Sequence, residues 1–308
     1  MEAKNFTVNL GSLPLYTTRW QLEEGRKPKA VIQIVHSLSE HMGRYDEFAT
    51  YLNDYGYEVW GHDHPGHGQT GPELGSCSGD AMSLLLGGIN ALRDVIKQES
   101  PDIPVVLMGH SVGAFLSMRA VELNKHSWDA LIISGANDRN PVLLERAVIA
   151  SNSLIARLKK RKVAEKAIFQ VILKGFTSGS LKLERADWRT RDSEEVNRFY
   201  KDPYCGFPIN HDFKRSLVRG LSYWYRREEL IKIENSLPIL IISGTEDRIG
   251  NYGRGASKLA KNLSDAGLLR IYLRFYEGAR HDLLWEYSRK ETMVDILEFI
   301  KLAVKEHN

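Results

Sequence analysis

Short apolar runs alternate with longer amphipathic stretches along most of the chain. The apolar runs predict buried strands at 31–35, 57–60, 105–108, 131–135, 238–244 and 270–276. The stretches between them predict helices at about 45–53, 80–98, 255–266 and 292–305. Two further runs, at 6–10 and 15–21, are separated by a Gly-Ser-Leu-Pro turn and predict a hairpin. This alternation predicts a mostly parallel sheet with helices on both faces.

The alternation stops after Asn137 and resumes near 237. Between 141 and 236 the chain looks helical and irregular, without buried-strand runs. A helical insertion between two parallel strands is expected to lie over their carboxyl ends, where open α/β sheets bind ligands. We therefore predict a core of residues 1–137 and 237–308 and a helical cap, or lid, of residues 138–236.

Composition narrows the range of functions. The 308 residues carry a net charge of +3, with 43% hydrophobic and 26% charged residues. That charge is too small for a nucleic-acid binder, so no nucleic-acid partner is predicted. The two cysteines form no C-x-x-C pair. The first residues lack the apolar core of a secretory signal, and no apolar stretch approaches bilayer length. A cytoplasmic protein is the expectation.

One segment of the predicted cap is strongly basic. It contains Arg157, Lys159, Lys160, Arg161, Lys162 and Lys166. A solvated helix face and peripheral contact with an anionic membrane surface are the two interpretations.

The segment Gly109–Gly113 reads Gly-His-Ser-Val-Gly and joins an apolar strand to a helical stretch. This is the G-x-S-x-G pattern of a nucleophile elbow, which exposes a serine at a sharp strand-to-helix turn. The glycines are needed where a side chain would clash with the tightly turned backbone. Ser111 is the predicted nucleophile.

A serine hydroxyl needs an imidazole as its base and a carboxylate to orient that imidazole. The usual chain order in this architecture is serine, acid, histidine, each after a strand. Asp247 follows the 239–243 strand and His281 follows the 270–276 strand. We predict these two as acid and base, with Glu246 as the alternative acid.

An oxyanion hole requires two backbone N–H groups aimed at the developing negative charge. Val112, directly after the nucleophile, is the first predicted donor, and Leu38, after the 31–35 strand, is the second. The histidines of the loop 62–67 match no zinc spacing. We expect them to orient a glycine-rich loop and predict no metal site.

Three segments together resemble one known family. They are 36–45 (His-Ser-Leu-Ser-Glu-His-Met-Gly-Arg-Tyr), 63–70 (Asp-His-Pro-Gly-His-Gly-Gln-Thr) and the elbow. They are similar to motifs of the monoacylglycerol lipase and lysophospholipase branch of the α/β-hydrolases. Segments 202–208, 249–253 and 276–281 resemble its bacterial members. Two departures are Ser37, where the family usually has glycine, and Arg248, where bacterial members usually have proline.

The resemblance implies an α/β-hydrolase fold with a cap inserted between two strands. It implies Ser111, Asp247 and His281 as the triad, Leu38 and Val112 as oxyanion donors, and no cofactor. It also implies hydrolysis of single-acyl lipid esters, monoacylglycerols or lysophospholipids, through an acyl-enzyme.

Apolar cap residues fit either an acyl tunnel or plain packing. They are Leu154, Ile155, Phe169, Ile172, Leu173, Phe176, Phe207 and Trp224. Of these we select Phe176 and Phe207, together with Leu38, as predicted substrate contacts.

Other functions of the same architecture stay open at this point. A short-chain or aryl esterase would use the same three residues. An aminopeptidase would need acidic cap residues for the substrate's amine, and Glu145, Glu165 and Glu184 are available. A ligand-binding homologue without turnover is a further alternative. A dehalogenase is excluded, because it requires a carboxylate where Ser111 stands.

Overall fold

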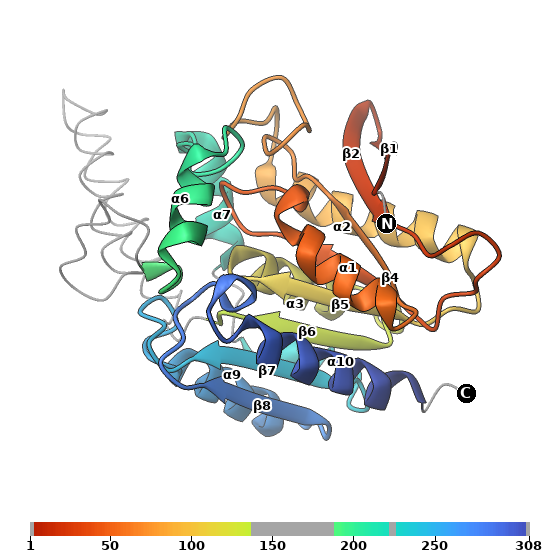
Figure 1. The fold of residues 1–308 in the computed structure, drawn as a ribbon, viewed down its shortest axis with the longest axis vertical. Coiled ribbons are helices and arrows are strands. Elements are labelled where there is room, and N and C mark those ends of the chain that lie inside the picture. Colours follow the sequence, from red (N-terminus) through yellow and green to blue (C-terminus); the bar gives the residue numbers. More distant parts are fainter. Residues whose placement is uncertain (1–2, 137–187, 222–225, 306–308) are drawn as a thin grey trace.

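The computed structural model describes residues 3–136, 188–221 and 226–305 (Figure 1). Within these ranges eight strands form one sheet, in the order β1-β2-β4-β3-β5-β6-β7-β8. The strands are β1 (Lys4–Leu10), β2 (Leu13–Trp20), β3 (Val31–Val35), β4 (Glu58–His62), β5 (Val105–His110), β6 (Ala130–Ser134), β7 (Ile239–Gly244) and β8 (Ile271–Tyr276). The first two form the predicted antiparallel hairpin, β2 pairs antiparallel with β4, and all later pairs are parallel.

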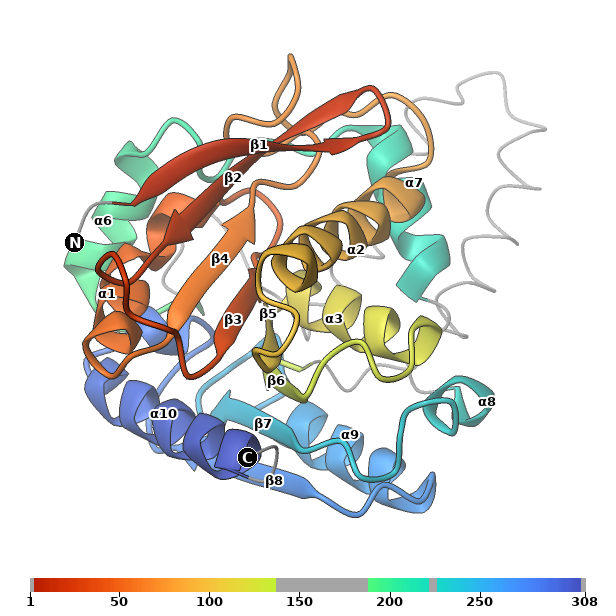
Figure 2. The same ribbon diagram turned by 90° about the vertical axis from the view of Figure 1, so that its right-hand side faces the viewer.

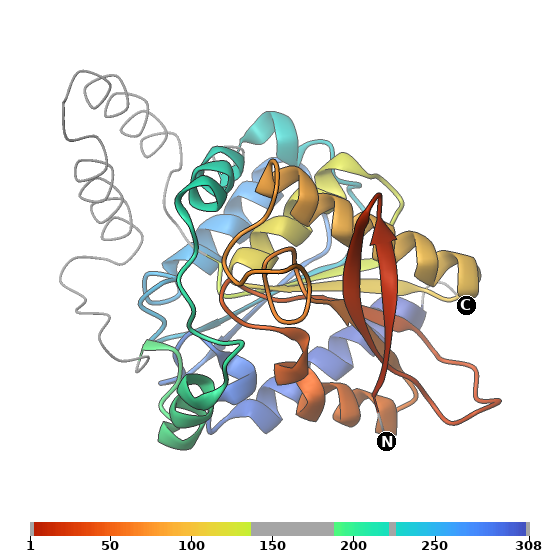
Figure 3. The same ribbon diagram turned by 90° about the horizontal axis from the view of Figure 1, so that it is seen from above.

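Helices cover both faces of the sheet, as predicted (Figures 2 and 3). One layer is formed by α2 (Ala81–Glu99), α3 (Val112–Leu123) and α9 (Arg254–Asp265), and the other by α1 (Asp46–Asp54) and α10 (Arg289–Lys305). Short 3-10 turns occur at Met42–Tyr45 and Leu283–Trp285. Strands β3 to β7 are buried along their whole length, which explains why most of their residues are apolar.

Helix α2 illustrates how the sequence builds this layer. The side chain of Asp80 caps the helix by accepting the N–H of Ser83 over 2.9 Å. Buried Leu85, Ile89 and Leu92 then recur at helical spacing. Strand β8 differs from the central strands, because it forms an edge of the sheet and is only partly buried.

Between β6 and β7, the described residues form three helices: α6 (Ser193–Lys201), α7 (His211–Leu221) and α8 (Arg227–Leu230). In Figure 1, α6 and α7 stand beside the edge toward which the central strand arrows point. The side chain of Ser216 accepts the N–H of Met82 and donates to Asp80, which attaches α7 to the start of α2. A helical insertion over this edge is thus confirmed, while its boundaries at 138 and 236 stay a prediction.

Several sequence predictions lie outside the described residues. They concern Phe176, the other apolar cap residues from 154 to 173, Trp224, the basic segment 157–166, and Glu145, Glu165 and Glu184. Within the described ranges, the predicted boundaries of strands and helices lie within two residues of the observed ones, except that α10 begins at Arg289 rather than 292. None of the helices in these ranges combines the length and apolar character needed to cross a bilayer.

Candidate active site

Ser111 occupies the turn between β5 and α3. Its backbone has φ 54° and ψ −114°, a region that residues with a Cβ rarely enter. Its N–H donates to the carbonyl oxygen of Ser134 over 2.8 Å. The residue is half-buried at the carboxyl end of a central strand. Strained backbone of this kind gathers at active sites, and the turn matches the predicted elbow.

The two glycines of the elbow are required by close packing. A Cβ on Gly109 would lie 2.3 Å from the carbonyl oxygen of Gly113. A Cβ on Gly113 would lie 2.0 Å from the carbonyl oxygen of Val35 at the end of β3. Both distances are far below van der Waals contact, so the first turn of α3 reaches its place only because these side chains are absent.

Asp247 and His281 form a buried pair. The Nδ1–H of His281 donates to Oδ2 of Asp247 over 2.9 Å. The other carboxylate oxygen, Oδ1, accepts the N–H groups of Ile249 and Gly250 at 2.9 and 3.0 Å. Since the carboxylate can only accept, the proton of a neutral imidazole stays on Nδ1 and leaves Nε2 free to act as a base. The neighbouring Glu246 is exposed, and His281 is hydrogen-bonded to Asp247.

The surroundings of His281 favour its protonated form. Burial lowers the pKa of this imidazole, but the charge and hydrogen bond of Asp247, helped by the charge of Asp282, outweigh burial and raise the pKa above its ordinary value. Its Nε2 atom is buried and makes no hydrogen bond with a described residue. The acceptor that the predicted chemistry needs is thus in place.

The imidazole of His281 lies next to the elbow. A Cβ on Gly135 would come within 2.7 Å of its Cε1 atom, and Gly135 follows Ser134, which accepts the Ser111 N–H. The rings of His110 and His281 have centroids 5.0 Å apart. The structure thus brings the three predicted residues to one place, although Ser111 and His281 are not hydrogen-bonded. Catalytic hydrogen bonds are often long without substrate and tighten in the complex.

The loop after β3 has the features expected of an oxyanion loop. The N–H of Ser37 is already bonded to Oε1 of Glu40 over 2.7 Å. Ser39 has a positive φ of 55°, so the backbone turns sharply directly after Leu38. Val112, the other predicted donor, is the first residue of α3, where helical N–H groups lack intrahelical acceptors. The geometry favours Leu38 over Ser37 as the second donor.

The insertion is joined to this loop. The N–H of Gly206 donates to the carbonyl of Ser39 over 2.9 Å, and the Ser39 hydroxyl donates to the carbonyl of Phe207 over 2.8 Å. Nε2 of His41 contacts Oδ2 of Asp202 at 2.8 Å. Leu38, Val112 and Phe207 are all partly buried and pack against the same hydrophobic core. Phe207 therefore lies beside the oxyanion loop, and its contact with substrate stays a prediction, whereas Phe176 is outside the described residues.

Sequence reasoning missed a buried ionic cluster at the centre of the site. Its hub is Asp282, whose Oδ2 accepts from Arg189 over 3.0 Å and from Arg44 over 3.4 Å. Its Oδ1 contacts Nε2 of His110 at 3.2 Å. Arg44 also bonds to Glu40, which holds the Ser37 N–H. The i, i+4 spacing of Glu40 and Arg44 was the one visible signal, and the cluster as a whole is a product of the tertiary fold.

Four buried histidines lie beneath the oxyanion loop: His36, His62, His64 and His67. The backbone N–H of His64 donates to Nε2 of His36 over 2.9 Å. Burial lowers the pKa of each ring, to about 4 for His62 and His67, which keeps the rings uncharged at neutral pH. Gly66 and Gly68 have positive φ values of 72° and 49°, as the predicted bends require.

Two groups of side chains in the described ranges have metal-ligand chemistry. In the first, Nδ1 of His41 accepts the N–H of Gly43, so the ring proton is on Nε2 and points at Asp202. That nitrogen is not free to bind a cation. In the second, His110, His281 and Asp282, two guanidinium groups already occupy the carboxylate. We assign a metal to neither group.

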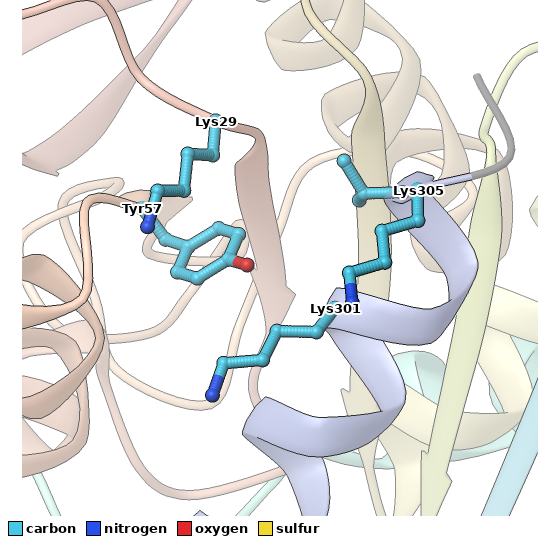
Figure 4. A pocket seen from close by; sticks show the side chains of 5 residues that line it. Lys29, Tyr57, Lys301 and Lys305 are labelled. Carbon is cyan, nitrogen blue, oxygen red and sulfur yellow. The ribbon is translucent and has the colours of Figure 1, made fainter. Parts of the chain in front are cut away.

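A separate pocket lies at the other end of the strands, where β3 and β4 begin (Figure 4). It is lined by Lys29, Tyr57, Lys301, Val304 and Lys305, where β3 and β4 begin and α10 ends. The ammonium of Lys29 donates to the carbonyl of Tyr55, and that of Lys301 donates to Glu298. These interactions explain Lys29 and Lys301 without a ligand, and the pocket lies at the opposite end of the strands from Ser111.

Comparison with known proteins agrees with this geometry. The family described as "Serine aminopeptidase, S33" matches residues 26–288. The chain belongs to this family. Its members are α/β-hydrolases, and the chain is a serine hydrolase.

Among individual relatives, a monoglyceride lipase homolog of monkeypox virus is 29% identical and covers 98% of this chain and 99% of its own length. The monoglyceride lipase of Rattus norvegicus is 29% identical, covering 90% of this chain and 82% of its own. The crystal structure of a thermostable carboxyl esterase from Bacillus coagulans, solved with glycerol, superposes with a TM-score of 0.83 at 23% identity and covers 98% of both chains. This last likeness shows the α/β-hydrolase fold.

Proposed function

We propose that this S33-family chain hydrolyses carboxylic esters of single-acyl lipids, monoacylglycerols first and lysophospholipids second, through an acyl-enzyme on Ser111. The observation that carries the proposal is the His281–Asp247 pair beside the strained serine. The names of the relatives, monoglyceride lipases in virus and rat, support the choice of an acyl glycerol as substrate.

In the proposed mechanism, Nε2 of His281 takes the Ser111 proton as the hydroxyl oxygen attacks the ester carbonyl. The N–H groups of Leu38 and Val112 bind the resulting oxyanion, each worth roughly 3–4 kcal/mol in comparable enzymes. The imidazolium then protonates the departing alcohol oxygen. A water molecule, deprotonated by the same Nε2, attacks the acyl-enzyme, and the imidazolium returns this proton to Oγ of Ser111 as the fatty acid leaves. No cofactor takes part.

The test uses the variant Ser111→Ala. It is expected to fold, because the alanine keeps the backbone contacts of the elbow, and to lose hydrolysis of p-nitrophenyl esters and monoacylglycerols. A fluorophosphonate probe should label the wild-type protein and not the variant. Turnover retained by the variant would refute the assignment of Ser111.

The family description favours a second candidate, hydrolysis of an amino-terminal residue. Such an enzyme must bind a free ammonium group next to the scissile bond, and the acidic cap residues considered for this lie outside the described residues. Parallel assays with amino-acyl naphthylamides and monoacylglycerols separate the two activities. A preference for the naphthylamides would replace the lipase proposal by the peptidase one.

Peripheral contact with a membrane is a further part of the proposal for a cytoplasmic enzyme of this kind. It is motivated by the basic segment 157–166 and by the low water solubility of acyl glycerols. Co-sedimentation with anionic and with zwitterionic vesicles tests it. If the protein binds neither kind of vesicle, or binds both equally, the proposed membrane contact is wrong. The proposed ester hydrolysis does not depend on this result.

A further inference from the structure

Asp282 comes directly after His281 and is completely buried. Its backbone N–H donates to the carbonyl of Arg189 over 2.7 Å, and its side chain meets Arg189, Arg44 and His110 as described above. A buried carboxylate is costly unless charged and hydrogen-bonded partners surround it. Asp282 has such partners from three distant parts of the chain.

Each partner belongs to a different part of the proposed machinery. Arg44 leads through Glu40 to the N–H of Ser37 in the oxyanion loop. His110 directly precedes Ser111 at the end of β5. Arg189 belongs to the described start of the insertion, where Thr190 also bonds to the carbonyl of Trp285. One carboxylate therefore joins three separate segments of the chain to the loop that carries His281.

The hydrogen-bond pattern also defines the His110 proton. The Ser134 hydroxyl lies 3.3 Å from Nδ1 of His110 and can donate to it. Nε2–H of His110 then donates to Oδ1 of Asp282 over 3.2 Å. A neutral His110 satisfies every contact, so no positive charge is required on the ring that faces His281.

We propose that Asp282 is a positioning residue for His281 and supplies a second negative charge beside that of Asp247 to the imidazolium formed during the reaction. This rests on the role of His281 as base proposed above. The groups around the His281 ring are Asp247 from the loop after β7, His110 from β5, and Trp188 and Arg189 from the insertion. Asp282 comes from the same loop as His281, and a carboxylate oxygen of Asp282 lies within 4.8 Å of a ring nitrogen of His281.

These groups act in opposite directions on the imidazole. Burial and Arg189 lower the pKa of His281, whereas Asp247 and Asp282 raise it. The acidic limb of the pH profile of kcat/KM reports this pKa in the free enzyme, because only the neutral imidazole accepts the serine proton. Removing Asp282 should therefore move the acidic limb to lower pH, and removing Arg189 should move it to higher pH.

The experiment compares Asp282→Asn with Arg189→Gln in p-nitrophenyl ester hydrolysis from pH 4.5 to 9. In Asp282→Asn the acidic limb should move to lower pH by about one unit. The rate per site at its optimum should fall about three- to ten-fold, because the imidazolium loses a stabilising charge. In Arg189→Gln the limb should move to higher pH by about half a unit.

Titration with a fluorophosphonate counts the intact sites, so a loss of folded protein does not enter the rates. Glu286→Gln is the matched control: this buried carboxylate holds the same loop by accepting the N–H of Arg280 over 2.8 Å and pairing with Arg191. It should leave the limb in place, because its charge does not face the His281 ring.

The proposal would be overturned if the acidic limb stays in place in both variants, or if it moves in the same direction in both. Asp282 would then be a purely structural residue. Should Asp282→Asn fail to fold, the direction of the Arg189→Gln shift decides. Failure of the proposed function looks different, because wild-type protein would then not react with the fluorophosphonate and Ser111→Ala would keep its activity.

Discussion

Replacing Asp247 by asparagine should inactivate the enzyme while leaving its shape almost unchanged. Oδ1 of Asp247 accepts two backbone N–H groups, at 2.9 and 3.0 Å, and Oδ2 accepts only the His281 proton. In the variant, the amide oxygen must stay with the two N–H groups, and the amide NH2 must face Nδ1. The imidazole then accepts at Nδ1 and carries its proton on Nε2, where it cannot take the proton of Ser111.

The size of this preference follows from the contacts. Turning the amide the other way leaves two buried N–H groups without acceptors, at a cost of at least about 2 kcal/mol. That value corresponds to more than about thirty-fold in favour of the inactive tautomer, before the lost carboxylate charge is counted. With the charge included, we expect kcat/KM for an aryl ester to fall about 10^4-fold, the scale seen for this change in other serine hydrolases.

The assay measures kcat/KM for p-nitrophenyl butyrate, together with the circular-dichroism spectrum and the melting temperature. Glu246→Gln is the matched control, since its exposed side chain lies next to Asp247 in the chain and should leave activity unchanged. A tenfold or smaller loss in Asp247→Asn would refute the assigned tautomer, and a large loss in Glu246→Gln would point to a different acid.

Three other predictions concern stability and pH. Gly113→Ala should lower the free energy of unfolding by at least about 2 kcal/mol in urea titrations, because its Cβ would lie 2.0 Å from the Val35 oxygen. A change below about 0.5 kcal/mol, as for an ordinary surface substitution, would contradict this packing. The unfolding free energy should also fall as pH drops from 6.5 toward 4, since His62 and His67 have folded pKa values of about 4 and bind protons more readily when unfolded; each contributes a loss of about 3 kcal/mol. His62→Leu, which removes a ring whose two nitrogens have no partner among described residues, should flatten that acid dependence, and an unchanged slope in urea titrations at pH 7, 5.5 and 4.5 would exclude His62 as its source.

Much of the site could be predicted because its chemistry is local in sequence. The elbow needs Gly109 and Gly113 within two residues of Ser111, and the acid and base each follow an apolar strand. Because the carboxyl ends of parallel strands lie on the same side of a sheet, the loops that carry the three residues are expected to lie close together. The same reasoning predicted Asp247 but kept Glu246 as an alternative, because these adjacent carboxylates differ in burial, which is a property of the fold.

The ionic cluster around Asp282 could not be predicted in this way. Arg44, Arg189 and His110 are separated from Asp282 by 93 to 238 positions, and no hydrophobic period or spacing connects them. Arg189 also belongs to a segment that sequence analysis treated only as part of a helical cap. Burial of ionic partners depends on which loops meet, so such a cluster is visible only after the chain is folded.

The backbone of Ser111 has a consequence for the evolution of this enzyme. A serine held at φ 54° and ψ −114° gives up on the order of 1–3 kcal/mol of stability to present its hydroxyl. Glycine would be relaxed in that conformation, and a Ser111→Gly protein should melt at a higher temperature than wild type while Ser111→Ala should not. Lineages released from selection for turnover would therefore gain thermal resistance by losing their nucleophile, so an unusually heat-stable relative with glycine at this position would be a sign of lost catalysis.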